Sequence, residues 1–135
     1  MVMFFEYDIT YPPNTPKENE QVNILRLTRG IVKRVELVFP RGVAALTGVR
    51  IFRGPVQVIP LNYPAWIETD GETVRINTNI DLTVNPYELE VRGYNIDDTY
   101  PHTIRVRIEM ELPEEQFKIP SVDEESERLI TEYGL

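Results

Sequence analysis

Thr103-Ile104-Arg105-Val106-Arg107-Ile108-Glu109-Met110-Glu111-Leu112 is the stretch that decides the fold, because apolar and charged side chains alternate along its whole length. One face would carry Ile104, Val106, Ile108, Met110 and Leu112, and the other Arg105, Arg107, Glu109 and Glu111. Successive side chains of a β-strand point to opposite faces of a sheet. The pattern therefore predicts a strand with one face in a core and the other in solvent or ion pairs.

Further short runs rich in Val, Ile, Thr, Tyr and Phe surround this strand. We expect strands at about residues 3–11, 22–28, 31–39, 49–53, 56–60, 73–77, 87–94 and 103–112. In the third run, Ile31, Val35, Leu37 and Phe39 would share the buried face, with Lys33 as an exception, and Val32, Arg34, Glu36 and Val38 would oppose them. Eleven prolines and seven glycines separate the runs, and Asp70-Gly71 is a strong hairpin signal. These features predict an all-β fold, an antiparallel β-sandwich or jelly roll of about eight strands.

Two segments do not fit the strand pattern. Residues 12–16 contain three prolines, which donate no ladder hydrogen bond, so we expect an extended arm or a long loop there. Residues 113–135 form a second region, an acidic linker followed by a short helical tail. A capping box begins at Ser121, and Val122, Leu129, Ile130 and Tyr133 would share one helical face. A helix this short is marginal alone, so we expect it to dock on a neighbouring surface.

Composition limits the chemistry of the chain. The net charge of −8 disfavours contact with nucleic acids and anionic membranes, so we expect neither as a partner. The chain has no cysteine, a single histidine, His102, and only two serines, both in the acidic tail. A Ser-His-Asp triad has no credible nucleophile here, and we expect no catalytic residue, no cofactor and no tightly bound metal. The lack of cysteine and the many prolines also fit a thermostable protein.

One loop, residues 93–103, carries oxygen-bearing side chains. Asn95, Asp97 and Asp98 could offer ligands to calcium, although the glycine and the distal glutamate of an EF-hand are missing. The alternative, which we favour, is a wide turn in which Asn and Asp side chains accept hydrogen bonds from nearby backbone amides. His102 would then be a hydrogen-bonded residue at the rim.

Aromatic and apolar residues in loops or at strand ends supply candidate interface residues. Tyr63, Trp66, Tyr94 and Tyr100 suit a protein interface or a sugar site, although Trp66 could equally plug one end of the sandwich. The uncharged connection 39–48 contains Val43 and Leu46 and is either an exposed contact patch or a loop folded over the sandwich edge. The candidate interface set is Val43, Leu46, Tyr63, Trp66, Tyr94, Tyr100, Leu129, Ile130 and Tyr133.

A wider pattern resembles a known group of proteins. It comprises Phe39-Pro40-x-Gly42, Val49-Arg50-Ile51-x-x-Gly54, Gln57, Pro60, Asp70-Gly71-Glu72-Thr73, Tyr87-x-Leu89, Gly93-Tyr94-Asn95 and His102-Thr103. This order is similar to small β-sandwich virion proteins of tailed phages and prophages, over about residues 20–112. The resemblance implies a capsid decoration or other auxiliary protein, commonly a homotrimer on the major capsid protein or another assembly subunit. It carries no catalytic residues, and the acidic tail lies outside it.

The expected function is therefore that of a non-enzymatic assembly protein in a virion, assembled in the host cytoplasm, or otherwise of a cytoplasmic protein. The first alternative is a carbohydrate- or ligand-binding module that uses Trp66 and nearby tyrosines. The second is a calcium-stabilised accessory domain of an enzyme. Self-association of the chain would favour the assembly protein over both alternatives.

Overall fold

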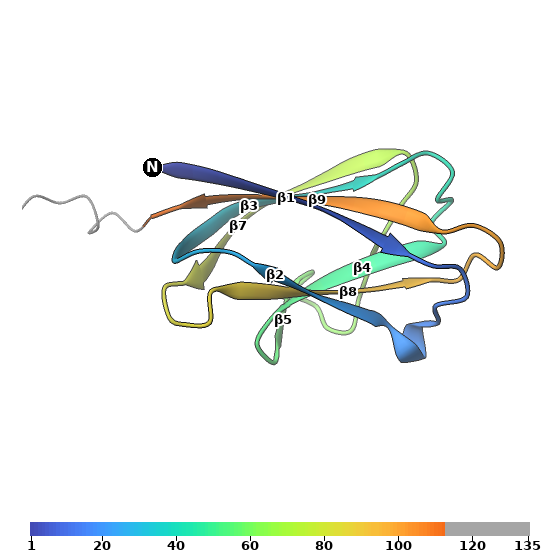
Figure 1. The fold of residues 1–135 in the computed structure, drawn as a ribbon, viewed down its shortest axis with the longest axis horizontal. Helices are drawn as coiled ribbons and strands as arrows, with labels where there is room; N and C mark the ends of the chain where they lie inside the picture. The colour runs from blue at the N-terminus through green and yellow to red at the C-terminus, as the bar shows by residue number, and fades with distance from the viewer. Residues whose placement is uncertain (113–135) are drawn as a thin grey trace, which may run out of the picture.

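The computed structural model describes residues 1–112, which form two antiparallel sheets packed face to face (Figure 1). The strands are β1 (Val2–Tyr11), β2 (Gln21–Arg26), β3 (Gly30–Phe39), β4 (Thr47–Arg53), β5 (Val56–Ile59), β6 (Ile67–Glu68), β7 (Glu72–Leu82), β8 (Glu88–Asn95) and β9 (His102–Glu111). A short 3-10 helix, η1 (Lys17–Asn19), precedes β2. Within residues 1–112, no helix has the length and apolar composition needed to cross a bilayer.

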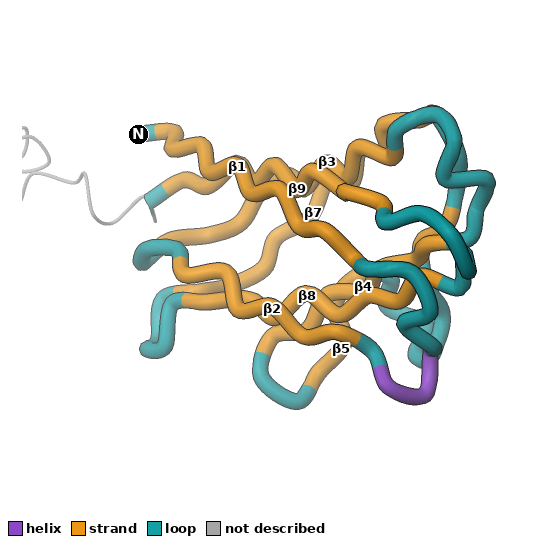
Figure 2. Tube along the Cα trace, turned by 45° about the vertical axis from the view of Figure 1, so that its right-hand side comes forward, coloured by secondary structure: helices purple, strands orange, loops and turns teal. Residues whose placement is uncertain are grey.

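The strand order is that of a jelly roll. One sheet runs β1-β9-β3-β7, and the other runs β2-β8-β4-β5, with β6 paired to β4. Figure 2 shows β1, β3, β7 and β9 in one layer and β2, β4, β5 and β8 in the other. Strands from the two halves of the chain pair in succession, β1 with β9, β2 with β8, β3 with β7, and β4 with β5 and β6. This is one long antiparallel ribbon folded into two layers. The all-β, antiparallel fold predicted from the sequence is confirmed.

The core lies between the two sheets and is built from the alternating strands. Ile104, Val106, Ile108 and Met110 of β9 are fully buried, as the alternation predicts. Leu89 and Val91 of β8 face them from the other layer and are buried too. At roughly 25 cal/mol per Å2 of buried apolar surface, a double layer of this kind is the main stabilising term of the fold.

A β-bulge in β3 changes one predicted face. Val32 pairs with Met110 of β9, and Arg34 pairs with the adjacent residue, Glu109. Lys33, which lies between Val32 and Arg34, is therefore an extra residue without a partner on β9. The bulge turns Val32 into the core and leaves Ile31 partly exposed. The expectation that Ile31 faces the core and Val32 faces out is therefore wrong, while that for Val35 is confirmed.

Two parts of the sandwich differ from the sequence-based expectation. Strand β7 has eleven residues, about twice the predicted length, because pairing with β3 continues past Asn77 to Leu82. The two-residue strand β6 was not predicted. Both depend on pairing partners distant in sequence.

The proline-rich segment 12–16 connects the two layers. Thr15 exchanges backbone hydrogen bonds with Asn95, and the backbone N–H of Asn14 donates to the carbonyl of Asp97 at 2.9 Å. The segment is an ordered loop that links β1 to β2, so the expectation of a long loop is confirmed and the alternative of an extended arm is wrong. The predicted acidic linker and helical tail, with Leu129, Ile130 and Tyr133, lie outside the described residues.

Candidate functional site

The outer face of the four-stranded sheet carries a row of alternating charges. Glu6, Arg107, Glu36 and Arg75 stand side by side on β1, β9, β3 and β7. Arg107 Nε lies 3.3 Å from a Glu6 oxygen, Arg107 Nη1 lies 3.4 Å from Glu36, and Arg75 Nε lies 3.4 Å from Glu36. We call these four residues the charge row. Each carboxylate in it is neutralised by an arginine on the next strand.

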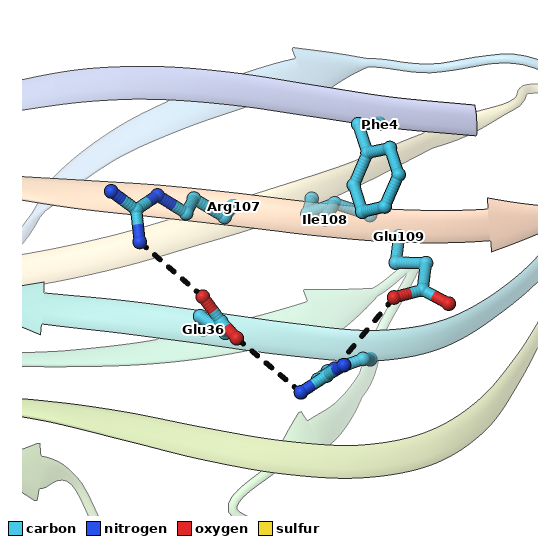
Figure 3. A pocket seen from close by; sticks show the side chains of 6 residues that line it. Phe4, Glu36, Arg107, Ile108 and Glu109 are labelled. Carbon is cyan, nitrogen blue, oxygen red and sulfur yellow. Dashed lines mark hydrogen bonds and ion pairs between the residues drawn. The ribbon is translucent and has the colours of Figure 1, made fainter. Parts of the chain in front are cut away.

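A shallow hollow of about 120 Å3 lies on this face beside the charge row. It is lined by Phe4, Arg34, Glu36, Arg107, Ile108 and Glu109. Figure 3 shows Phe4 projecting beside Glu109, while Glu36 contacts Arg107 on β9. Arg34 closes the set by contacting Glu36 at 3.5 Å and Glu109 at 3.7 Å.

The aspartate of this face is poorly suited to act as a general acid. On the next row of the sheet, Arg105 Nε donates to Asp8 Oδ1 at 2.8 Å, and this hydrogen bond lowers the pKa of the Asp8 carboxyl. A general acid at neutral pH needs the opposite shift. Among residues 1–112, no group of three or more His, Cys, Asp or Glu side chains could hold a metal ion. The face is a self-neutralised surface that can contact another protein.

The sandwich is open along one side, where both sheets end. Within residues 1–112, β1 pairs with β9 alone and β2 pairs with β8 alone, so each strand has a free edge. The two edges are joined, because the Tyr7 hydroxyl donates to the carbonyl of Arg26 at 2.6 Å and Gln21 Nε2 donates to the carbonyl of Thr10 at 3.2 Å. Figures 1 and 2 both show β1 above β2 on this side. We call it the β1–β2 edge.

Large apolar side chains are exposed along the β1–β2 edge. Phe4 is 74% and Val2 49% exposed on β1, and Val22 is 47% and Ile24 43% exposed on β2. Free strand edges pair readily with other chains unless charges, prolines or bulges prevent it. Val2 and Phe4 lie on the outer face of the four-stranded sheet, and Val22 and Ile24 lie on the outer face of the other sheet. Each free edge therefore carries its own pair of exposed apolar residues, which is typical of a contact surface.

The predicted aromatic patch is only partly brought together. The Trp66 ring packs edge-on against Tyr94, with 4.8 Å between ring centres. Tyr94 is almost fully buried and donates its hydroxyl to Glu68, so we correct the expectation that it lines an interface. Tyr63 and Tyr100 are largely exposed.

Beneath this patch lies an arginine that the sequence analysis did not single out. Arg50 of β4 points to the outer face of its sheet, yet it is only 8% exposed. Its guanidinium lies 4.3 Å from the centre of the Trp66 ring and contacts Glu20 through two nitrogens. The connection from β5 to β6 folds over it, held by Gln57 Nε2, which donates to the carbonyls of Pro60 and Ala65. One face of the Trp66 ring therefore covers an ion pair.

The loop between β8 and β9 is a turn held by its own side chains. Asn95 Oδ1 accepts from the N–H of Asp97, and Asp97 Oδ1 accepts from the N–H groups of Thr99 and Tyr100. The other Asp97 oxygen lies 2.9 Å from His102 Nε2. The favoured interpretation, a turn stabilised by Asn and Asp side chains with His102 hydrogen-bonded at the rim, is confirmed.

The apolar connection from β3 to β4 folds inward. Val43 is fully buried in the core, and Leu46 is partly buried. Asp70 fastens the loop, because its Oδ1 accepts from the N–H groups of Gly42 and Ala44. Val43 thus offers no contact surface, and its place in the candidate interface is corrected in favour of a loop folded over the sandwich edge.

Comparison with known proteins adds little. No protein-family model matches the chain, and no curated protein matches its sequence. Among solved structures, the chain is similar to one from work entitled "Bacillus endospore appendages form a novel family of disulfide-linked pili", with 8% identity, a TM-score of 0.43, and coverage of 83% of this chain and 89% of that one. It is also similar to a chain in the structure of Tomato Aspermy Virus, with 13% identity and a TM-score of 0.47. The match covers 89% of this chain and 82% of that one. Both similarities are too distant for a function to be transferred.

The exposed apolar residues of the β1–β2 edge are not recognisable from the sequence. The sequence predicts strands that contain Phe4, Val22 and Ile24, but it does not indicate that these three side chains are exposed. Only the pairing of distant strands leaves β1 and β2 at the edges. No local signal marks these two segments as edges, because the central strand β9 also lacks proline and glycine.

Proposed function

We propose that this chain is a non-enzymatic structural subunit that assembles with other copies of itself. The observation that carries the proposal is the β1–β2 edge, where two strands with unpaired backbone groups lie together and expose Phe4, Val22 and Ile24. A neighbouring strand that pairs with either edge would satisfy its backbone groups and help to cover the apolar side chains exposed on that strand.

The charged face supports the same proposal. The charge row neutralises itself, so subunits could approach across this face without strong repulsion, despite a net charge of −8 for the chain. The excess of acid is concentrated elsewhere, since residues 113–135 contain seven acidic and two basic residues. Residues 1–112 are closer to balance, with fifteen acidic and twelve basic residues.

The specific form of the proposal is a homotrimeric auxiliary protein of a virion that sits on the major capsid protein or another assembly subunit. It rests on the resemblance of residues 20–112 to small phage and prophage β-sandwich proteins. The carbohydrate-binding alternative is less well supported, because Arg50 covers one face of the Trp66 ring and Tyr94 packs against the ring in a T-shaped contact.

Light scattering on the full chain at micromolar concentration tests the proposal. We expect a particle heavier than the single-chain mass of 15.7 kDa, and three times that mass for a trimer. A matched variant, Phe4→Glu with Ile24→Lys, should shift the particle toward the monomer, because charge is placed on the β1–β2 edge without touching the core. A monomeric natural chain would contradict the proposal.

A further inference from the structure

The opposite side of the sandwich also ends in a free strand. Within the described residues, β7 pairs with β3 alone, so the other edge of this eleven-residue strand is open. Its outward side chains include Arg75, whose side chain is 61% exposed, and Asn77. Its inward side chains Val74 and Ile76 are only partly buried against the core.

The charge row ends in opposite charges at the two edges of the sheet. It begins with Glu6 on β1 and finishes with Arg75 on β7, in the order acid, base, acid, base. A second copy placed with its β1 next to β7 would continue this alternation without interruption. Opposite charges that face each other across neighbouring strands stabilise the pairing, whereas like charges destabilise it.

We propose that β7 of one copy pairs antiparallel with β1 of the next copy, with Arg75 opposite Glu6 of the neighbour. This inference rests on the proposed self-assembly and specifies its interface. The four-stranded sheets of successive copies become one continuous sheet, and the charge row runs through the junction.

The inward side chains fit the same register. With Arg75 opposite Glu6, Ile76 lies opposite Phe5 of the next copy and Val74 lies opposite Tyr7, because paired residue numbers on antiparallel strands have a constant sum. In the single chain these side chains are only partly buried, although they pack against the core. Pairing would therefore join the apolar layers of both copies.

Apolar side chains are also exposed near both edges of the second sheet. Val22 and Ile24 are exposed on β2, next to β1. On the β7 side, Val56 is 58% and Leu61 78% exposed, and both line a groove of about 460 Å3 that includes β7 residues. In the proposed register, however, the β7 residues of this groove, Thr78 to Asp81, lie opposite the start of the neighbour's β1, whereas β2 lies beside the end of β1. The junction therefore rests on the four-stranded sheet alone.

Pairing of β1 with a second β1 is less favourable. Because Glu6 and Asp8 are outward neighbours near the middle of β1, an antiparallel pair centred there places Glu6 opposite Glu6 and Asp8 opposite Phe4. The β7–β1 contact avoids this repulsion and joins two different surfaces. Repetition of such a contact closes a ring or extends a filament.

Disulfide trapping tests the register, because the natural chain contains no cysteine. Phe4→Cys and Asn77→Cys are introduced together into the full chain. Directly opposite residues of antiparallel strands have Cα atoms about 4.5–5.5 Å apart, within the range a disulfide spans. Within one chain, the two positions lie in the same row but three strand spacings apart, about 14 Å, which is too far to bridge. We expect most chains to become linked to others under mild oxidation.

Three controls separate the alternatives. Phe4→Cys alone and Asn77→Cys alone should give no linked dimers, and dimers from either single variant would overturn the proposal by revealing like-with-like pairing. Phe4→Cys with Asp81→Cys should also remain unlinked, since Asp81 lies about 13 Å farther along β7. If the double variant stays unlinked, the β7–β1 contact is wrong.

Light scattering on the same samples separates this failure from failure of the proposed function. An oligomer without the 4–77 disulfide refutes only the β7–β1 contact. A monomer refutes self-assembly as well.

Discussion

Glu20 holds the Arg50 guanidinium by a two-point contact, with Arg50 Nη2 lying 3.0 Å and 3.1 Å from the two carboxylate oxygens. Both side chains are largely screened from water, with 10% of Arg50 and 16% of Glu20 exposed. The pair is therefore a buried charge network on a face of the sheet that would otherwise be solvated.

Glu20→Ala should destabilise the fold strongly. It leaves a buried guanidinium without its main counter-charge, and the loss of one partner from a buried pair typically costs about 3–5 kcal/mol. Chemical denaturation measures the effect. Glu88→Ala is the matched control, because its partner Arg26 is 80% exposed and the loss should stay below about 1 kcal/mol. Equal losses at both positions would contradict the assignment.

Ile108→Ala should cost about 2–5 kcal/mol, the usual range for a large-to-small change in a core. Ile108 is fully buried on the central strand β9. Its neighbour Glu109 points to the other face, where it contacts Arg34 at 3.7 Å, so Glu109→Ala should cost less than about 1 kcal/mol. Thermal unfolding of the two variants compares the faces directly. A larger loss for Glu109→Ala would show that the faces are reversed.

Two tyrosines on β1 should respond differently to loss of the hydroxyl. The Tyr11 hydroxyl is buried without a hydrogen-bond partner among the described residues, and burial raises its pKa. Tyr11→Phe should thus leave stability unchanged or increase it. The Tyr7 hydroxyl donates to the carbonyl of Arg26, so Tyr7→Phe should cost about 1 kcal/mol. Urea unfolding of both variants tests the contrast, and a greater loss for Tyr11→Phe would refute it.

The β8–β9 loop should make stability depend on acid pH. Hydrogen bonds from the backbone of Thr99, the side chain of His102 and the backbone of Tyr100 lower the pKa of the Asp97 carboxyl. A carboxyl whose pKa is lower in the folded state stabilises it above the unfolded value, near 3.8, and this stabilisation disappears as the pH falls through the folded value. Asp97→Asn should be less stable than the natural chain at pH 7, with a gap that narrows below about pH 4. Urea midpoints from pH 7 to pH 2.5 measure the gap, and a constant gap would contradict the prediction.

Local pattern alone was sufficient for the fold class and for the face of most strands. The alternation of β9 correctly placed Ile104, Val106 and Ile108 in the core because a strand's side-chain period of two is independent of its partners. The same local chemistry predicted the Asn95 and Asp97 turn, since those side chains bond amides two or three residues away.

Tertiary structure decided which strands are edges and which outward side chains are buried. Glu6 meets Arg107 across 101 positions of sequence, and Arg50 meets Glu20 across 30, so no local pattern specifies either contact. The bulge at Lys33 likewise exists only because β3 must match the register of β9. Composition and periodicity determined that this chain is a β-sandwich, whereas long-range strand pairing determined where it stays open, because a free edge is defined by the partner that a strand lacks.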